Sequence, residues 1–271
     1  MPTPPDLVDA RLDVADGVAT LVLDRDDVRN ELTGTKLVDD IERTVAWINA
    51  EPMIGALVIT GAGRAFSSGG NVKHMRDRAG SFAGDVYEVA QRYRAGIQRM
   101  PLALRRLDVP AIAAINGPAI GAGFDLACMC DIRLAAEHAT MGETFVNVGI
   151  TPADGGAWLL QRLIGYQRAA ELTFSGRVID AQEARGLGIV LEVVPGEALM
   201  TRAQGLAASF AAKPPRALRL TKQLMRSAAR MDLPEFLELC AVYQGICHNT
   251  DDHLEAVSAM LEKRVPRFSG R

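Results

Sequence analysis

Histidine and cysteine are scarce in this sequence, with four of each among 271 residues. No C-x-x-C motif is present. Among the histidines only His248 and His253 lie close together in the sequence, in a segment of surface character. The sequence therefore predicts neither a metal site nor a disulfide. Cysteines in apolar or helical surroundings are typical of small buried residues in a reducing compartment, so we expect a cytoplasmic protein.

A leader and a long apolar run are also missing. The opening, Met1–Asp6, has neither a basic nor an apolar region, so we expect no signal peptide. The most apolar stretch, Val109–Cys130, is interrupted by two prolines, an asparagine and an aspartate, which predicts a strand, a turn and a helix rather than a membrane span.

Charge of either sign is not in excess. Lysine and arginine total 30 and aspartate and glutamate 33, which gives a formal net charge of −3. This balance indicates no general attraction to nucleic acid or to an anionic membrane. The phosphate-loop pattern G-x-x-x-x-G-K-[ST] is absent, and no G-x-S-x-G surrounds the serines at 67 and 68, which disfavours a serine hydrolase.

What the sequence does contain is an alternation of short apolar strands with helical stretches. Its predicted strands are 17–23, 56–60, 111–115, 132–135 and 189–194, and its predicted helices in this part are 35–51, 122–129, 157–164, 167–174 and 181–186. Such alternation favours a layered α/β domain. After Pro195 the segments 199–212, 215–229, 234–247 and 251–264 are all helical in character. We therefore predict a core over residues 1–195 and a helical region over residues 196–271, whose apolar stripes are typical of core or subunit interface.

Two segments share a single design, an apolar strand followed by a glycine-rich turn. They are Ala65–Lys73 (AFSSGGNVK) and Asn116–Asp125 (NGPAIGAGFD), and the second leads into a helix. Glycine lets the backbone approach a ligand closely, and a helix N-terminus points free N–H groups outward. Two such turns facing each other would form an oxyanion hole, which stabilises negative charge on a carbonyl oxygen.

These segments resemble the two oxyanion segments of the enoyl-CoA hydratase/isomerase (crotonase) family. The likeness continues through Cys130–Arg133, Gly149–Pro152, Gly155–Gly156 and Lys263–Phe268, so that it covers nearly the whole chain. It implies a spiral of β-β-α units with C-terminal helices that form a homotrimer or a dimer of trimers. It also implies an acyl-CoA substrate without a separate cofactor, and backbone N–H donors at Ser68 and Ala122. The coenzyme A contacts that it implies are Arg29, Ser67, Gly69, Asn71, Val72, Lys73 and, from the closing segment, Phe268.

Three acids are candidates for moving protons. Asp125 lies one helical turn beyond Ala122, where the helix dipole favours an ionised carboxylate that could act as a base. The family has an acid at this position, commonly the longer glutamate. The second glutamate of the hydratases aligns with Phe145, which cannot move a proton. Asp154, just before a helix, is either a helix cap or a substitute acid, and Glu143 is a weaker candidate.

The sequence therefore predicts an enzyme that stabilises a thioester enolate, either an atypical hydratase or a double-bond isomerase. Two alternatives remain open at this point. One is a non-catalytic acyl-CoA-binding subunit, and the other is a hydrolase on the same fold.

Overall fold

The main sheet positions the rest of the chain. The computed structural model describes residues 3–271, and Met1 and Pro2, part of the opening considered for a leader, lie outside the described residues. Six strands follow the order β1-β2-β3-β4-β6-β9. Their bounds are β1 (Ala10–Ala15), β2 (Val18–Leu23), β3 (Ala56–Gly61), β4 (Ala111–Ile115), β6 (Ile132–Ala136) and β9 (Glu192–Val194). Only β1 and β2 are antiparallel; the other neighbours pair in parallel. The central strands β3 and β4 are almost wholly buried, which explains their continuous apolar sequences.

A second, smaller sheet contains β5 (Ala119–Ile120), β7 (Thr140–Gly142) and β8 (Val178–Asp180). Strand β4 continues into β5 and helix α5 (Ala122–Met129), and β6 continues into β7 and, after a turn, α6 (Gly156–Ile164). In both units the first strand joins the main sheet and the second joins the small sheet. This repeat confirms the predicted α/β class and its β-β-α organisation.

The remaining helices cover the sheets or extend from them. They are α1 (Leu37–Ala50), α2 (Val72–Arg76), α3 (Val86–Ala95), α4 (Arg99–Arg106), α7 (Tyr166–Ser175), α8 (Ala181–Gly186), α9 (Leu199–Ala211), α10 (Pro215–Ala228), α11 (Leu233–His248) and α12 (Asp251–Glu262). The apolar stripe that predicted α1 is its buried face: Leu37, Ile41, Val45 and Ile48 are all buried. No helix among the described residues is both long and apolar enough to cross a membrane.

Two groups of elements differ from the sequence prediction. Strands β1, β5, β7 and β8 and helices α2, α3 and α4 were not predicted, and β5, β7 and β8 have only two or three residues each. Strand β9 is shorter than the predicted 189–194. Ile189 and Val190 are buried, but their N–H groups donate to the Ala184 carbonyl at the end of α8 instead of to a strand.

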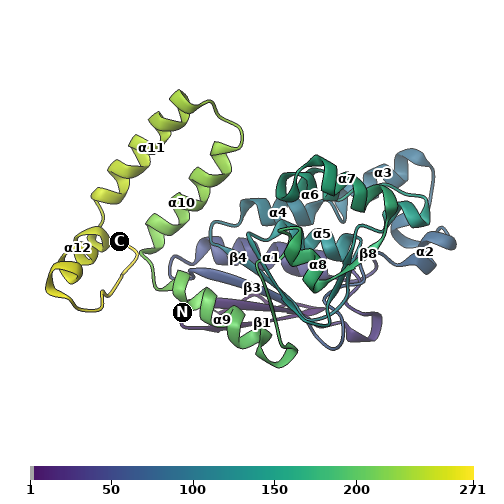
Figure 1. Cartoon of the computed structure of the whole chain (residues 1–271), viewed down its shortest axis with the longest axis horizontal. Helices are drawn as coiled ribbons and strands as arrows, with labels where there is room; N and C mark the ends of the chain where they lie inside the picture. Colours follow the sequence, from purple (N-terminus) through teal and green to yellow (C-terminus); the bar gives the residue numbers. More distant parts are fainter. Residues whose placement is uncertain (1–2) are drawn as a thin grey trace.

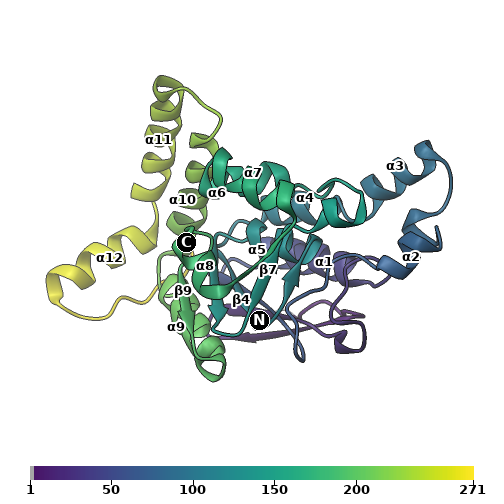
Figure 2. The same cartoon turned by 45° about the vertical axis from the view of Figure 1, so that its right-hand side comes forward.

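The last four helices do not form one unit. Helix α9 lies along the main sheet and contacts β2, β3, β4 and β6 through a buried stripe of Leu199, Ala203 and Ala207. Helices α10, α11 and α12 instead project from the core, at the end opposite α2 and α3 (Figures 1 and 2). We call α10–α12 and the residues after them the C-terminal arm. The packing boundary therefore follows α9, whereas the sequence division at Pro195 precedes it.

The C-terminal arm is attached to the core by a buried lysine. Lys222 of α10 is 6% exposed, and its ammonium donates to the Val109 carbonyl and, at 2.7 Å, to Asp131 Oδ2. The same carboxylate oxygen accepts the N–H of Ala111, the first residue of β4. Asp131 thus links the arm to two core strands.

Replacing Lys222 by methionine should destabilise the chain by about 1–3 kcal/mol, because the buried Val109 carbonyl loses this donor and Asp131 keeps only the Ala111 N–H. Urea unfolding measures the change. Lys213→Met is the matched control, since Lys213 is exposed and has no such partner among the described residues, and its effect should stay within about 0.5 kcal/mol. Equal unfolding midpoints for the two variants would contradict the role given to Lys222.

Candidate functional site

The two predicted glycine-rich turns lie against each other. Ser67 and Ala119 form a parallel β-bridge, and the Ile120 N–H donates to the Ser67 carbonyl at 3.0 Å. Glycine is required at this contact, because a Cβ on Gly123 would lie 2.2 Å from the Ser67 oxygen. The expected pairing of the two turns is thus present in the fold.

The two backbone N–H groups expected to bind an oxyanion differ in their present partners. None of residues 3–271 accepts a hydrogen bond from the Ala122 N–H, which belongs to the first residue of α5. The Ser68 N–H donates to the Arg29 carbonyl at 2.9 Å. The role predicted for Ser68 therefore requires this N–H to leave Arg29 or to share its hydrogen between two acceptors.

The three candidate acids meet in one buried cluster, which we call the carboxyl triad: Asp125, Glu143 and Asp154. Asp125 lies in the first turn of α5, Glu143 directly follows β7, and Asp154 precedes α6. Their exposed fractions are 0%, 1% and 3%. Gly156 makes the room that they occupy: a Cβ at this position would lie 2.2 Å from Glu143 Oε1 and 2.3 Å from Asp125 Oδ1.

Electrostatics in the triad favour protonated carboxyls. None of the six carboxyl oxygens has a hydrogen-bond donor when all three groups are ionised, and no cation pairs with them in the described part of the chain. Burial, followed by the charges of its two neighbours, raises the pKa of Asp125 well above its ordinary value. Burial likewise raises the pKa of Asp154, and that of Glu143 to about 7.

The raised pKa of Asp125 opposes the expectation, drawn from the helix dipole, that this carboxyl stays ionised. The helix dipole stabilises an anion by about 0.3–1 kcal/mol at an exposed terminus, whereas removing a carboxylate from water without a partner costs several kcal/mol. A protonated Asp125 can instead donate to its neighbours. Hydrogen bonds from Asp125 favour the ionised forms of Glu143 and Asp154 and partly offset the burial that raises their pKa values.

A cavity of about 100 Å³ lies where the two turns meet the triad. It is lined by Thr33, Ser68, Gly70, Val72, Met75, Phe82, Tyr93, Ile97, Ile120, Gly121, Ala122, Thr144, Phe145, Val148, Ile150 and Asp154. We call it the turn cavity. Asp154 is the one carboxyl on its wall, and Asp125 and Glu143 lie behind it. Phe145 occupies the wall where the resemblance places the second glutamate of a hydratase.

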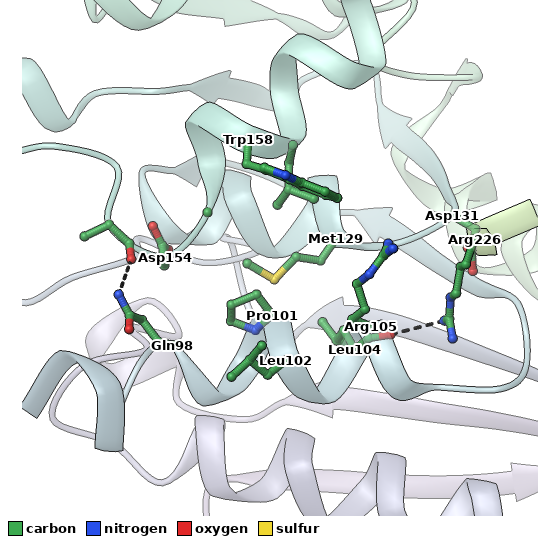
Figure 3. Close-up of a pocket in the computed structure, with 13 residues that line it drawn as sticks. Gln98, Pro101, Leu102, Leu104, Arg105, Met129, Asp131, Asp154, Trp158 and Arg226 are labelled. Carbon is green, nitrogen blue, oxygen red and sulfur yellow. Dashed lines mark hydrogen bonds between the residues drawn. The ribbon is translucent and has the colours of Figure 1, made fainter. Parts of the chain in front are cut away.

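A larger cavity of about 440 Å³ also reaches Asp154, from the side of α4 and α6. Figure 3 shows Trp158 and Met129 over its middle, Asp154 near Gln98 at one end, and Arg105 towards the other. The Gln98 side chain donates to the Ala153 carbonyl at 2.8 Å and ties α4 to the turn that carries Asp154. Asp154 thus borders both cavities.

Six of the seven expected coenzyme A contacts lie in or next to the first turn. The buried Ser67 hydroxyl donates to the Asn30 carbonyl. The Asn71 side chain accepts the His74 N–H and so caps α2. Val72 lines the turn cavity and Lys73 is exposed beside it. The remaining two of the six are Arg29 and Gly69. Phe268 follows α12 in the C-terminal arm, at the other end of the chain from α2 (Figure 1), so one chain does not bring it to this group.

Sequence reasoning missed the wall contributed by α3 and by Ile97, two residues beyond its end. Tyr93 and Ile97 line the turn cavity. Burial and the nearby Asp154 charge raise the pKa of Tyr93, so its phenol lies close to the triad. A signal was available: Asp85 and Glu88 have the spacing of a capping box, and Val86, Val89 and Tyr93 recur at helical spacing. The sequence shows the Gly155–Gly156 pair, but it does not reveal that Gly156 leaves room for the carboxyl groups of Asp125 and Glu143.

The room at Gly156 can be tested by filling it. Gly156→Ala should destabilise the chain by about 1–3 kcal/mol, because the added methyl overlaps two carboxyl groups in a packed interior. Urea unfolding gives the value. Gly205→Ala on α9 is the control, since no atom lies within 4 Å of its added Cβ and alanine is the better helix former. Similar unfolding energies for both variants would show that the triad is not packed against Gly156.

The raised pKa values predict how stability changes with pH. A triad carboxyl keeps its proton when folded and loses it when unfolded, so its stability contribution is complete below the unfolded pKa and is lost as the pH rises through the folded value. For Glu143 the window runs from 4.5 to about 7. The wild type should therefore lose stability between pH 4.5 and pH 8, and Glu143→Gln should not show this loss. The difference in unfolding free energy, variant minus wild type, should be about 1–3 kcal/mol more favourable to the variant at pH 8 than at pH 4.5.

Urea unfolding at both pH values measures this difference. Glu137→Gln, at an exposed position, serves as the control and should leave the pH profile unchanged. Parallel profiles for the wild type and Glu143→Gln would contradict a raised Glu143 pKa.

Comparison with known proteins agrees with this geometry. The sequence profile described as enoyl-CoA hydratase/isomerase matches residues 13–271. A probable enoyl-CoA hydratase of Mycobacterium tuberculosis is 32% identical over 256 residues, covering 94% of this chain and 95% of that protein. The 1,2-epoxyphenylacetyl-CoA isomerase of Escherichia coli is 34% identical, with coverages of 95% and 97%. A crystal structure of an enoyl-CoA hydratase from Bacillus anthracis superposes with a TM-score of 0.90 at 33% identity, covering 97% of this chain and all of that one. The chain belongs to the enoyl-CoA hydratase/isomerase family.

Proposed function

We propose that the chain catalyses double-bond isomerisation of an enoyl-CoA thioester. The observation that carries this proposal is the single carboxyl on the wall of the turn cavity, Asp154, opposite an apolar wall that includes Phe145. Hydration needs one group to activate water and a second to protonate Cα. Isomerisation needs one group that removes a proton at one carbon and returns it at another.

The reaction follows from the groups present. Asp154 in its ionised form removes a proton from Cα of a 3-enoyl thioester, and the electron pair moves into a dienolate with its charge on the thioester oxygen. The Ala122 N–H, together with the Ser68 N–H once it is released from or shared with Arg29, donates to that oxygen. Removing one such donor typically costs about 3–4 kcal/mol of transition-state stabilisation. Asp154 then returns the proton to Cγ, which gives the 2-enoyl thioester.

The rest of the triad adjusts the proton affinity of Asp154. Asp125 keeps its proton most firmly and donates towards its neighbours, so one negative charge can be shared by Asp154 and Glu143. A carboxyl with a pKa raised towards neutrality suits a group that must both take and give a proton. In this proposal Asp125 and Glu143 position and tune Asp154 without touching the substrate.

An atypical hydratase is the second candidate, and the relatives named as hydratases favour it. It would use Asp154 with a triad partner in place of the missing glutamate. A non-catalytic acyl-CoA-binding subunit and a thioester hydrolase remain as outcomes of the test below.

The proposal extends to the form in which the enzyme works. The thioester supplies the only coenzyme required, and the enzyme would act in the cytoplasm without nucleic acid or membrane partners. A trimer or a dimer of trimers is supported by apolar side chains exposed on the C-terminal arm, among them Leu237, Val242, Leu254 and Met260. Such a neighbour could also bring Phe268 to a ligand.

The test uses a short 3-enoyl-CoA in deuterated water, followed by mass spectrometry and ultraviolet absorption of the conjugated product. We expect 2-enoyl-CoA without a gain of water. Asp154→Asn should lower kcat by about 10²–10⁴-fold, because it removes the proton-transfer group. Glu137→Gln, exposed on the surface, should keep full activity.

Each other product identifies a different function. A 3-hydroxyacyl-CoA would establish the hydratase, and free coenzyme A would establish the hydrolase. Tight binding of the 3-enoyl-CoA without any product would favour the binding subunit.

A further inference from the structure

Arg92 on α3 carries a charge that none of the described residues neutralises. Within residues 3–271 its guanidinium forms neither a hydrogen bond nor an ion pair, and its Nη1 is buried without a partner. Arginine remains protonated under all ordinary conditions, and a buried donor without an acceptor is costly. The unpaired Nη1 therefore indicates an acceptor that this chain does not supply.

The acidic residues nearest to Arg92 in the sequence already have other hydrogen-bond partners. Glu88, four residues before Arg92, is placed where a helical partner would lie. Its Oε2 instead accepts the Asp85 N–H at 3.0 Å, while Asp85 Oδ1 accepts the Glu88 N–H at 2.9 Å. This reciprocal cap holds the start of α3. One turn beyond Arg92 lies Gly96, which has no side chain to offer.

Arg92 lies in the same region as the proposed reaction centre. A small cavity beside Arg92 is lined also by Thr33, Ser81, Phe82, Tyr93 and Ile97. All of these except Ser81 also line the turn cavity, which contains Asp154. Figures 1 and 2 show α3 at the end of the molecule away from the C-terminal arm, so the arm of the same chain does not cover this region.

We propose that Arg92 binds a carboxylate at the far end of the acyl group, so that the preferred substrates are coenzyme A thioesters of short dicarboxylic acids. The inference rests on the proposed acyl-CoA function. A carboxylate matches both the charge of the guanidinium and its two-pronged donor geometry. A short chain suffices because the cavity beside Arg92 shares four of its six lining residues with the turn cavity that contains Asp154. A phosphate of coenzyme A offers similar oxygen acceptors, so the experiment separates the two sources.

Calorimetry compares three probes: glutaryl-CoA, valeryl-CoA of the same chain length, and free coenzyme A. Saturated thioesters report binding without turnover. We expect the wild type to bind glutaryl-CoA about 10- to 100-fold more tightly than valeryl-CoA, as for a hydrogen-bonded charge pair. Arg92→Met should lose that preference and keep its affinity for valeryl-CoA. Arg94→Met, an exposed arginine on the same helix, should behave as the wild type.

Loss of folding does not confound this test, because Arg92 has no partner to lose and Arg92→Met should melt at or above the wild-type temperature. Equal affinity of the wild type for the two thioesters overturns the proposal. So does a preference that survives in Arg92→Met. Equal weakening of all three probes in that variant would assign Arg92 to a coenzyme A phosphate and would also overturn it. If no probe binds the wild type, the acyl-CoA function itself fails, and this inference fails with it.

Discussion

Three carboxyl groups buried together without a counter-charge are the constraint on which the site depends. Each belongs to a different segment: Asp125 to α5, Glu143 to the end of β7, and Asp154 to the turn before α6. Like charges in one dry pocket cannot all ionise, so the triad holds protons and its members interact as a unit. Packing α5 against α6 creates this pocket, and Gly156 leaves it unfilled. The packing of α5 against α6 therefore also determines how readily the three carboxyl groups ionise.

This coupling gives each acid a separate task. Asp154 alone reaches the cavities, and it is also the acid whose turn is held by Gln98 from α4. Asp125, one methylene shorter than the glutamate common in the family, withdraws from the cavity and meets the other two carboxyls instead. Phe145 closes the remaining wall with an apolar ring. In the proposed isomerase this arrangement would concentrate proton transfer in Asp154, while Asp125 and Glu143 stay buried away from water.

Sequence patterns predicted those parts whose signal is local. Buried strands such as β4 and helices such as α1 and α5 follow from apolar periodicity and glycine turns, and the pairing of the two turns followed from the family resemblance. The triad could not be predicted as a triad, because residues 125, 143 and 154 meet only through tertiary packing. The helix dipole favours an ionised Asp125, whereas burial, which only tertiary packing determines, raises its pKa. Helix α3 has a capping-box signature at its start, but its apolar residues are at most partly buried.

Trp158 gives the larger cavity an optical property. The chain contains only two tryptophans, and Trp47 lies on α1, away from both cavities. Trp158 lines the larger cavity beside Asp154, with the Arg162 guanidinium 3.9 Å and that of Arg105 5.4 Å from its ring centroid. Indole emission responds to the charges and water around the ring, and two cations already surround this one. The protein thus carries a native fluorophore in the same cavity wall as Asp154, where no label needs to be introduced.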